Sequence, residues 1–218
     1  MSTRVLRSWS LGEEIAHSVS HGIGVALSIA GLAVLVAFAA LRADAWYVTS
    51  CAVFGATLVL LYTASTLYHS IPQPRAKRVL RILDHSAIYL AIAGSYTPLT
   101  LGPLRGPWGW TLFAVVWSGA VGGVVLTSLA LDRTRVLGLV LYAIMGWCLL
   151  VAFGPLLRSV PTGGIALLVA GGLAYSLGVV FYLWKSLRFH HFVWHLMVLL
   201  GSTLHVLAVL LFVIPRPR

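Results

Sequence analysis

Charged side chains are scarce in this sequence of 218 residues, in which Asp, Glu, Lys and Arg together make up 9%. A soluble domain carries about a quarter charged residues, and this chain lacks the polar groups that would cover a water-facing surface. Hydrophobic residues make up 60% of the chain, and the mean hydropathy is +0.96. The composition therefore excludes an ordinary soluble protein and predicts one that is embedded in lipid.

Acidic residues are especially rare, with five against 15 Lys and Arg, and the formal net charge is +10. The basic residues stand in short segments between apolar runs, without the aromatic interleaving of a nucleic-acid groove. We therefore interpret them as topology signals that meet anionic membrane lipids, and we expect no nucleic acid as a partner. The two cysteines, Cys51 and Cys148, lie inside apolar runs and indicate neither a disulfide nor a thiolate site.

Long apolar runs are abundant instead, and a transmembrane helix needs about 20 mostly apolar residues. Seven such runs are present, at 19–41, 46–69, 82–102, 109–131, 136–157, 162–184 and 191–214. We predict an all-α integral membrane protein, with one domain over residues 1–218 and a polar segment, 1–18, that leads into a seven-transmembrane helix bundle. The breaks are short, so consecutive helices are expected to be antiparallel. Gly119 and Gly123 form a GxxxG pair, which indicates close helix packing.

The distribution of Lys and Arg predicts the orientation of this bundle, because basic residues are enriched in cytoplasmic loops. With seven spans, ten of them share the side of the N-terminus: Arg4, Arg7, Arg75, Lys77, Arg78, Arg81, Arg133, Arg135, Lys185 and Arg188. Five fall on the other side: Arg42, Arg105, Arg158, Arg216 and Arg218. The N-terminus is therefore predicted to be cytoplasmic and the C-terminus to be outside.

Histidines are the main ionisable residues near the apolar runs, where such groups are costly and usually functional. Seven of the eight stand at the start of the first, third or seventh expected span or at the end of the second: His17, His21, His69, His85, His190, His191 and His195. Antiparallel threading gathers them at one end of the bundle, together with Glu14 and Asp84. His205 lies near the middle of the seventh span.

The spacing of these residues favours a metal site. His191 and His195 are four residues apart and share one helix face, while Ser65 stands one turn before His69. Three imidazoles and a water form a typical open zinc site, which lowers the pKa of the bound water. A lone histidine at a membrane interface is more often a hydrogen-bonded surface residue. We favour metal binding because these pairs and Asp84 converge at one end.

Four motifs carry a resemblance to bacterial haemolysin III-like proteins, relatives of the progesterone and adipoQ receptors. They are Glu13–Gly24, Ser65–His69, Leu83–Tyr89 and His191–His195, and the similarity runs from near residue 11 to the C-terminus. The resemblance implies a seven-helix protein of the bacterial inner (plasma) membrane with a cytoplasmic N-terminus.

The same resemblance implies a set of site residues. It implies Zn2+ held by His69, His191 and His195, with Asp84 engaging a water on the metal. Ser65 matches the serine of the superfamily. These roles extend to alkaline ceramidases, distant relatives that cleave a lipid amide, and they make Asp84 and Ser65 the candidate catalytic residues.

One position departs from the family pattern. The first motif usually reads Glu-x-x-Asn-x-x-x-His, and here His17 stands at the Asn position between Glu14 and His21. An imidazole is larger than an amide and can titrate. His17 is therefore either a supporting polar group, as we expect of Glu14 and His21, or an added metal ligand.

Three functions are compatible with these residues. The leading hypothesis is a zinc-dependent intramembrane hydrolase of a lipid amide or ester, in which Asp84 handles the proton. The second is a receptor or regulator in which zinc clamps the second and seventh spans and has no catalytic role. The third is a pore-forming haemolysin-like protein or transporter, which would need polar groups near the midplane of the membrane, where His205 stands.

Overall fold

The structure is a computed structural model that describes residues 9–215, and within them every regular element is a helix. The helices are α1 (Leu11–Arg42), α2 (Ala45–Ser70), α3 (Pro74–Leu101), α4 (Pro107–Ala130), α5 (Arg135–Trp147), α6 (Phe153–Ser159), α7 (Thr162–Leu183) and α8 (His190–Ala208). A 3-10 turn, Cys148–Ala152, joins α5 to α6, and a π-helical turn, Val209–Val213, extends α8. The predicted all-α class is confirmed.

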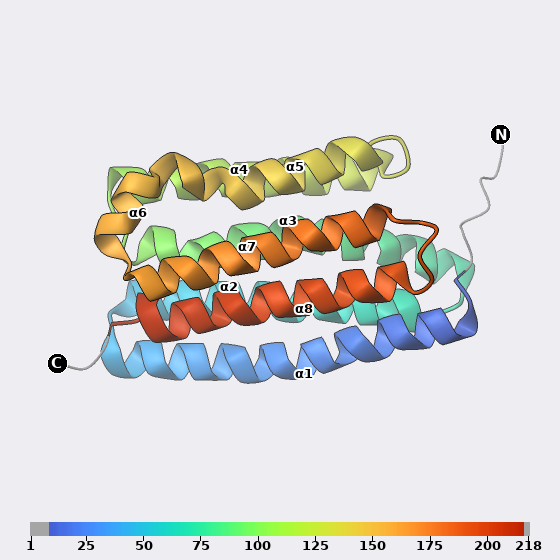
Figure 1. Ribbon diagram of the computed structural model, residues 1–218, viewed down its shortest axis with the longest axis horizontal. Helices are drawn as coiled ribbons and strands as arrows, with labels where there is room; N and C mark the ends of the chain where they lie inside the picture. Colours follow the sequence, from blue (N-terminus) through green and yellow to red (C-terminus); the bar gives the residue numbers. More distant parts are fainter. Residues whose placement is uncertain (1–8, 216–218) are drawn as a thin grey trace.

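The helices run lengthwise and alternate in direction (Figure 1). The first residues of α1, α3, α5 and α8 lie at the end of the bundle where α2, α4 and α7 finish. Helix α2 packs between α1 and α3, α3 packs on α4, and α8 packs on both α7 and α1. This is the antiparallel threading that the short connections predict, and it brings α1, α2 and α8 together at one end.

Six helical segments are long and apolar enough to cross a membrane: Leu11–Arg42, Ala45–Ser70, Pro107–Ala130, Val136–Ser159, Thr162–Leu183 and His190–Val213. The chain is thus a multi-pass membrane protein. The expected span 82–102 lies in α3, which is not among the six, because Asp84, His85 and many hydroxyl groups lower its hydropathy. Helix α3 packs between α2 and α4 with much of its second half buried, so the hydroxyl groups of Ser86, Thr97 and Thr100 face protein.

Helix α1 begins earlier than the apolar run 19–41, since a capping box stabilises its first turn. The Glu13 backbone N–H donates to the Ser10 hydroxyl over 3.3 Å, and the Ser10 backbone N–H donates to the Glu13 carboxylate over 2.9 Å. The expected polar segment 1–18 is therefore partly helical, and Glu14 and His17 belong to the same helix as His21. Of the basic residues that predict the orientation, Arg4, Arg7, Arg216 and Arg218 lie outside the described residues.

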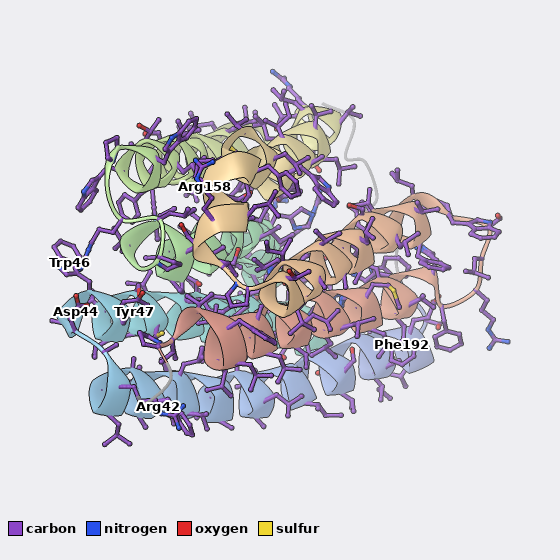
Figure 2. The ribbon with its side chains drawn as sticks, turned by 60° about the vertical axis from the view of Figure 1, so that its left-hand side comes forward. Arg42, Asp44, Trp46, Tyr47, Arg158 and Phe192 are labelled. Carbon is purple, nitrogen blue, oxygen red and sulfur yellow. The ribbon has the colours of Figure 1, made fainter. Side chains whose placement is uncertain are left out.

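The opposite end of the bundle is held by loop contacts (Figure 2). Asp44 caps α2, because its Oδ1 accepts from the backbone N–H of Trp46 and Tyr47 over 3.0 and 3.2 Å. The Arg105 guanidinium donates to Asp44 Oδ2 over 2.8 Å and lowers the pKa of this carboxyl group. The loop after α1 is thereby tied to the loop after α3.

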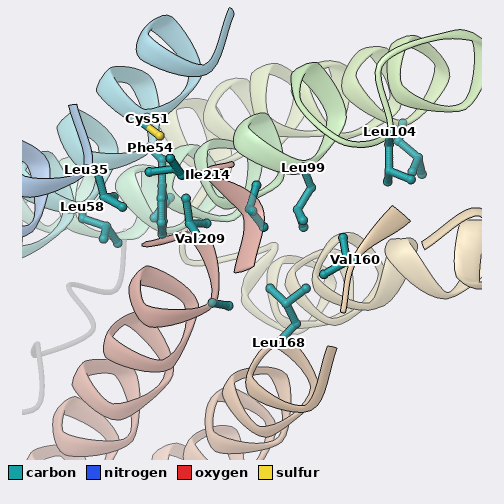
Figure 3. Close-up of a cluster of buried hydrophobic side chains, with 14 of the residues drawn as sticks. Leu35, Cys51, Phe54, Leu58, Leu99, Leu104, Val160, Leu168, Val209 and Ile214 are labelled. Carbon is teal, nitrogen blue, oxygen red and sulfur yellow. The ribbon is translucent and has the colours of Figure 1, made fainter. Parts of the chain in front are cut away.

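An apolar core fixes the helices relative to one another (Figure 3). Leu35 of α1, Phe54 of α2, Leu99 of α3 and Val209 beyond α8 are all buried in one cluster, 2% exposed or less. Burial of such side chains stabilises by about 1.5–3 kcal/mol each in water, whereas in lipid the close packing itself carries more of the association.

Candidate metal centre

Five histidines from three helices meet at the end of the bundle where α1 and α8 begin. His17 and His21 come from α1, His69 from α2, and His191 and His195 from α8. All five are buried. The ring centroid of His17 lies 4.6 Å from that of His69 and 4.7 Å from that of His191. Antiparallel threading therefore does gather these imidazoles.

Three of the five are close enough to share one ion. His17, His69 and His191 each offer a ring nitrogen, and these atoms lie within 4.8 Å of one another. Both nitrogens of His17, Nε2 of His69 and Nδ1 of His191 are buried without a hydrogen-bond partner. Unsatisfied buried polar atoms are rare and costly, and imidazole nitrogens suit zinc and similar transition metals. The residues present thus fit a metal ion.

His195 lies beside this group of three. Its ring centroid is 4.7 Å from that of His191 and 5.2 Å from that of His69. Its Nδ1 is 3.2 Å from the His17 backbone oxygen and 3.2 Å from the Ser20 hydroxyl. A backbone oxygen only accepts, so Nδ1–H is the donor and the lone pair is on Nε2, as in most metal-bound histidines that are oriented by a carbonyl. Its role as a ligand stays a prediction.

His21 packs behind His195. The two rings stack at 3.6 Å with an interplanar angle of 11°, and the Tyr62 ring lies 5.0 Å from His21. Both nitrogens of His21 are buried without a hydrogen-bond partner. His21 thus lies beside His195, and its role as a supporting polar residue stays a prediction.

Glu14 contacts the cluster through His69. Its Oε2 is 2.7 Å from His69 Nδ1, and its Oε1 accepts from Lys77 Nζ over 2.6 Å. The Glu14 carboxylate of α1 thus contacts side chains of both α2 and α3.

Asp84 and Ser65, the two candidate catalytic residues, belong to α3 and α2. Asp84 lines a cavity of about 40 Å³ together with His85, Tyr142, Tyr182, His191 and Trp194. Such a volume has room for a few waters, and both Asp84 and His191 line it. Ser65 is 1% exposed on α2, one turn before His69. Asp84 is not part of the group formed by His17, His69 and His191. The catalytic roles of Asp84 and Ser65 stay predictions.

Trp9 and Ser20 are part of the site without having been predicted from the sequence. The Trp9 ring stacks on His191 with centroids 5.0 Å apart and contacts the edge of His17 at 5.1 Å. Ser20 stands three residues after His17 and therefore on the same helix face, a spacing that could have revealed it. Trp9 precedes α1 and carries no periodic signal.

A family described as Haemolysin-III related matches residues 9–206. The chain belongs to this family. The match confirms the resemblance drawn from the four motifs, and it spans every histidine of the cluster. Relatives in the family are similar over nearly their whole length. The Hemolysin-3 homolog of Bacillus subtilis (strain 168) is 46% identical over 209 residues, which cover 96% of this chain and 98% of the relative.

Two further relatives show how far the similarity extends. Hemolysin-3 of Bacillus cereus is also 46% identical, over 93% of both chains. The monocyte to macrophage differentiation factor of Homo sapiens is 30% identical over 212 residues, which cover 90% of this chain and 83% of the human protein. The sequence similarity therefore extends from bacterial to animal proteins.

Proposed function

We propose that this haemolysin III-related protein binds Zn2+ at the histidine cluster and hydrolyses an amide or ester bond of a membrane lipid. The observation that carries the proposal is a set of buried imidazole nitrogens without partners, next to a cavity that holds a carboxylate. His69 and His191 would hold the metal, with His195 and His17 as the other candidate ligands. When bound, zinc polarises a carbonyl and lowers the pKa of a water at neutral pH.

The residues around the metal supply the rest of the chemistry. Asp84 lies on the cavity wall with His191 and would accept the proton of the attacking water. The Ser65 hydroxyl would donate a hydrogen bond to the substrate oxygen. Ile88, Leu131, Leu139 and Trp194 form the apolar part of the cavity wall. These side chains would keep bulk water away from the scissile bond.

The proposal includes a single domain over residues 1–218 that crosses the bacterial plasma membrane seven times, with α3 as the third span. Helix α2 ends at the histidine end and α4 begins at the opposite end. Both α2 and α4 are candidate spans. Helix α3 connects the end of α2 to the start of α4 and therefore has to cross the membrane. A cytoplasmic N-terminus is supported by the excess of Lys and Arg on its side.

The first test is the zinc content of protein purified in detergent, measured by elemental analysis. We expect about one zinc per chain in the wild type and its loss in His69→Ala, His191→Ala and His195→Ala. His205→Ala is the matched control, because this histidine contacts Leu168 instead of the cluster and its removal should leave the metal in place. Absence of zinc from the wild type after supplementation would overturn the proposal.

Activity is tested separately on zinc-loaded protein with lipid amides and esters in mixed micelles. We expect hydrolysis by the wild type and its loss in Asp84→Asn, which keeps the size of the side chain and should keep the zinc. Hydrolysis that is unchanged in Asp84→Asn would exclude Asp84 as the proton acceptor.

A non-catalytic receptor or regulator is the second candidate, and the position of His17 favours it. A fourth imidazole beside His69, His191 and His195 would fill the position that a catalytic zinc keeps open for water. Retained zinc without hydrolysis of any lipid would support this alternative.

A pore, which the name Hemolysin-3 of the relatives suggests, has less support. His205 is the histidine that lies deep in the bundle, 3.2 Å from the Leu168 backbone oxygen. It lines an otherwise largely apolar cavity, which does not favour a path for ions.

A further inference from the structure

Glu14 bridges two side chains from different helices. His69 of α2 is on one side, with its Nδ1 2.7 Å from Glu14 Oε2, and Lys77 of α3 is on the other, with its Nζ 2.6 Å from Glu14 Oε1. The His69 side chain is 0% exposed, whereas those of Glu14 and Lys77 are 19% and 20% exposed. The three residues thus form a line from the partly exposed end of the bundle into the buried cluster.

The carboxylate decides which nitrogen of His69 faces the cluster. An ionised carboxylate only accepts hydrogen bonds, so His69 Nδ1 carries the proton and donates it to Glu14. The lone pair then belongs to Nε2, which is buried without a hydrogen-bond partner. Histidines that bind metals usually donate their other N–H to a carboxylate or carbonyl, which fixes the ring and raises its basicity.

Both carboxylate oxygens of Glu14 are therefore engaged, one by His69 and one by Lys77. We propose that Glu14 is a positioning residue that orients His69 toward the metal, and that Lys77 holds Glu14 in place for this task. This inference rests on the proposed metal site but not on hydrolysis. Lys77 follows α2 by way of the short 71–73 connection, so α1, α2 and α3 all contribute to the orientation of one ligand.

The competing explanation is that Glu14 only links α1 to α2 and α3 as a structural ion pair. The neighbouring carboxylate provides a matched control, because Glu13 lies on the same helical turn and bonds to Ser10. Glu13→Gln removes one negative charge from α1 and keeps a side chain that can still complete the capping box. Glu14→Gln removes the same charge and keeps the shape of the side chain.

The experiment measures zinc affinity by chelator competition on the full-length protein in detergent, for the wild type, Glu14→Gln, Glu13→Gln and Lys77→Met. Loss of a carboxylate partner of a metal-bound histidine typically weakens metal binding about 10- to 100-fold. We expect a loss of this size in Glu14→Gln, a smaller loss in Lys77→Met and none in Glu13→Gln. Visible absorption of the Co2+-loaded proteins should change in Glu14→Gln, because the ligand field depends on the orientation of His69.

Thermal unfolding of the metal-free proteins separates the two explanations. A positioning role leaves the metal-free Glu14→Gln protein as stable as the Glu13→Gln control, whereas a purely structural role lowers its unfolding temperature and leaves the Co2+ spectrum unchanged. Equal zinc affinity in the two Gln variants overturns the inference while the proposed hydrolase stands. If the wild type binds zinc and Glu14→Gln binds it more weakly, but no lipid is hydrolysed, the hydrolase proposal is overturned and the inference stands. A wild type without zinc overturns both.

Discussion

At the scale of single residues, His17 changes what the cluster can hold. Its ring contacts Trp9, His69, His191 and His195, so it lies at the centre of the group. An Asn at this position would be smaller and would offer an amide instead of two ring nitrogens. His17, the residue that departs from the family motif, is therefore one of the three histidines whose ring nitrogens lie within 4.8 Å of one another.

Close packing at Gly123 gives a prediction about one methyl group. A Cβ at Gly123 would lie 2.4 Å from the Tyr89 ring, which is 0% exposed and cannot move aside, whereas a Cβ at Gly122 would meet nothing within 4 Å. We expect Gly123→Ala to destabilise the protein by about 1–3 kcal/mol through overpacking. Gly122→Ala on the same helix should be neutral or stabilising by up to about 1 kcal/mol. Thermal unfolding in detergent measures both, and equal effects would contradict the contact.

At the scale of helices, the first turn of α2 gives a prediction about pH. Arg105 lowers the pKa of Asp44, so the ion pair stabilises the folded protein above the pKa of the unfolded carboxyl group, about 3.9. This stabilisation is lost as the pH falls through the folded pKa. We expect Asp44→Asn to keep the helix cap, since Asn caps helices as well as Asp does. The variant should lose the pH-dependent stabilisation by the ion pair with Arg105.

The measurement is the unfolding temperature of the wild type, Asp44→Asn and Asp44→Ala between neutral pH and about pH 3. The gap between wild type and Asp44→Asn should be small, because exposed ion pairs are weak, and it should narrow toward the acidic end. Asp44→Ala should be less stable than Asp44→Asn throughout, because it also loses the cap. A gap that persists unchanged at acidic pH would contradict the assignment.

The helical features that could be predicted from the sequence are those with a signal in neighbouring residues. The apolar runs and the shared face of His191 and His195 follow from helical periodicity. The early start of α1 was also readable, because Ser10 and Glu13 form a capping box. The contact between Lys77 and Glu14 was not, because it depends on how the turn between α2 and α3 packs against α1. The break of the fifth run at 148–152 was readable too, because Pro155 has no backbone N–H to donate to the Val151 carbonyl and its ring crowds that carbonyl.

At the scale of the whole molecule, α3 offers a test of the proposed third span. If α3 crosses the membrane, Arg78 near its start and Arg105 after its end lie on opposite sides. We expect a membrane-impermeant maleimide to label Arg105→Cys in intact cells and Arg78→Cys only after permeabilisation. The background chain carries Cys51→Ser and Cys148→Ser. Labelling of both positions from one side would contradict seven spans, and the reverse pattern would contradict the cytoplasmic N-terminus.

The histidine end joins the two extremes of the chain, since α1 and α2 supply His17, His21 and His69 and α8 supplies His191 and His195. During synthesis the first three histidines leave the ribosome long before the last two. A nascent chain therefore carries an incomplete set of imidazoles until its final helix has inserted. For the proposed metal site, loading would then be a late step of biogenesis, and a chain that stops before α8 would lack His191 of the three-histidine group.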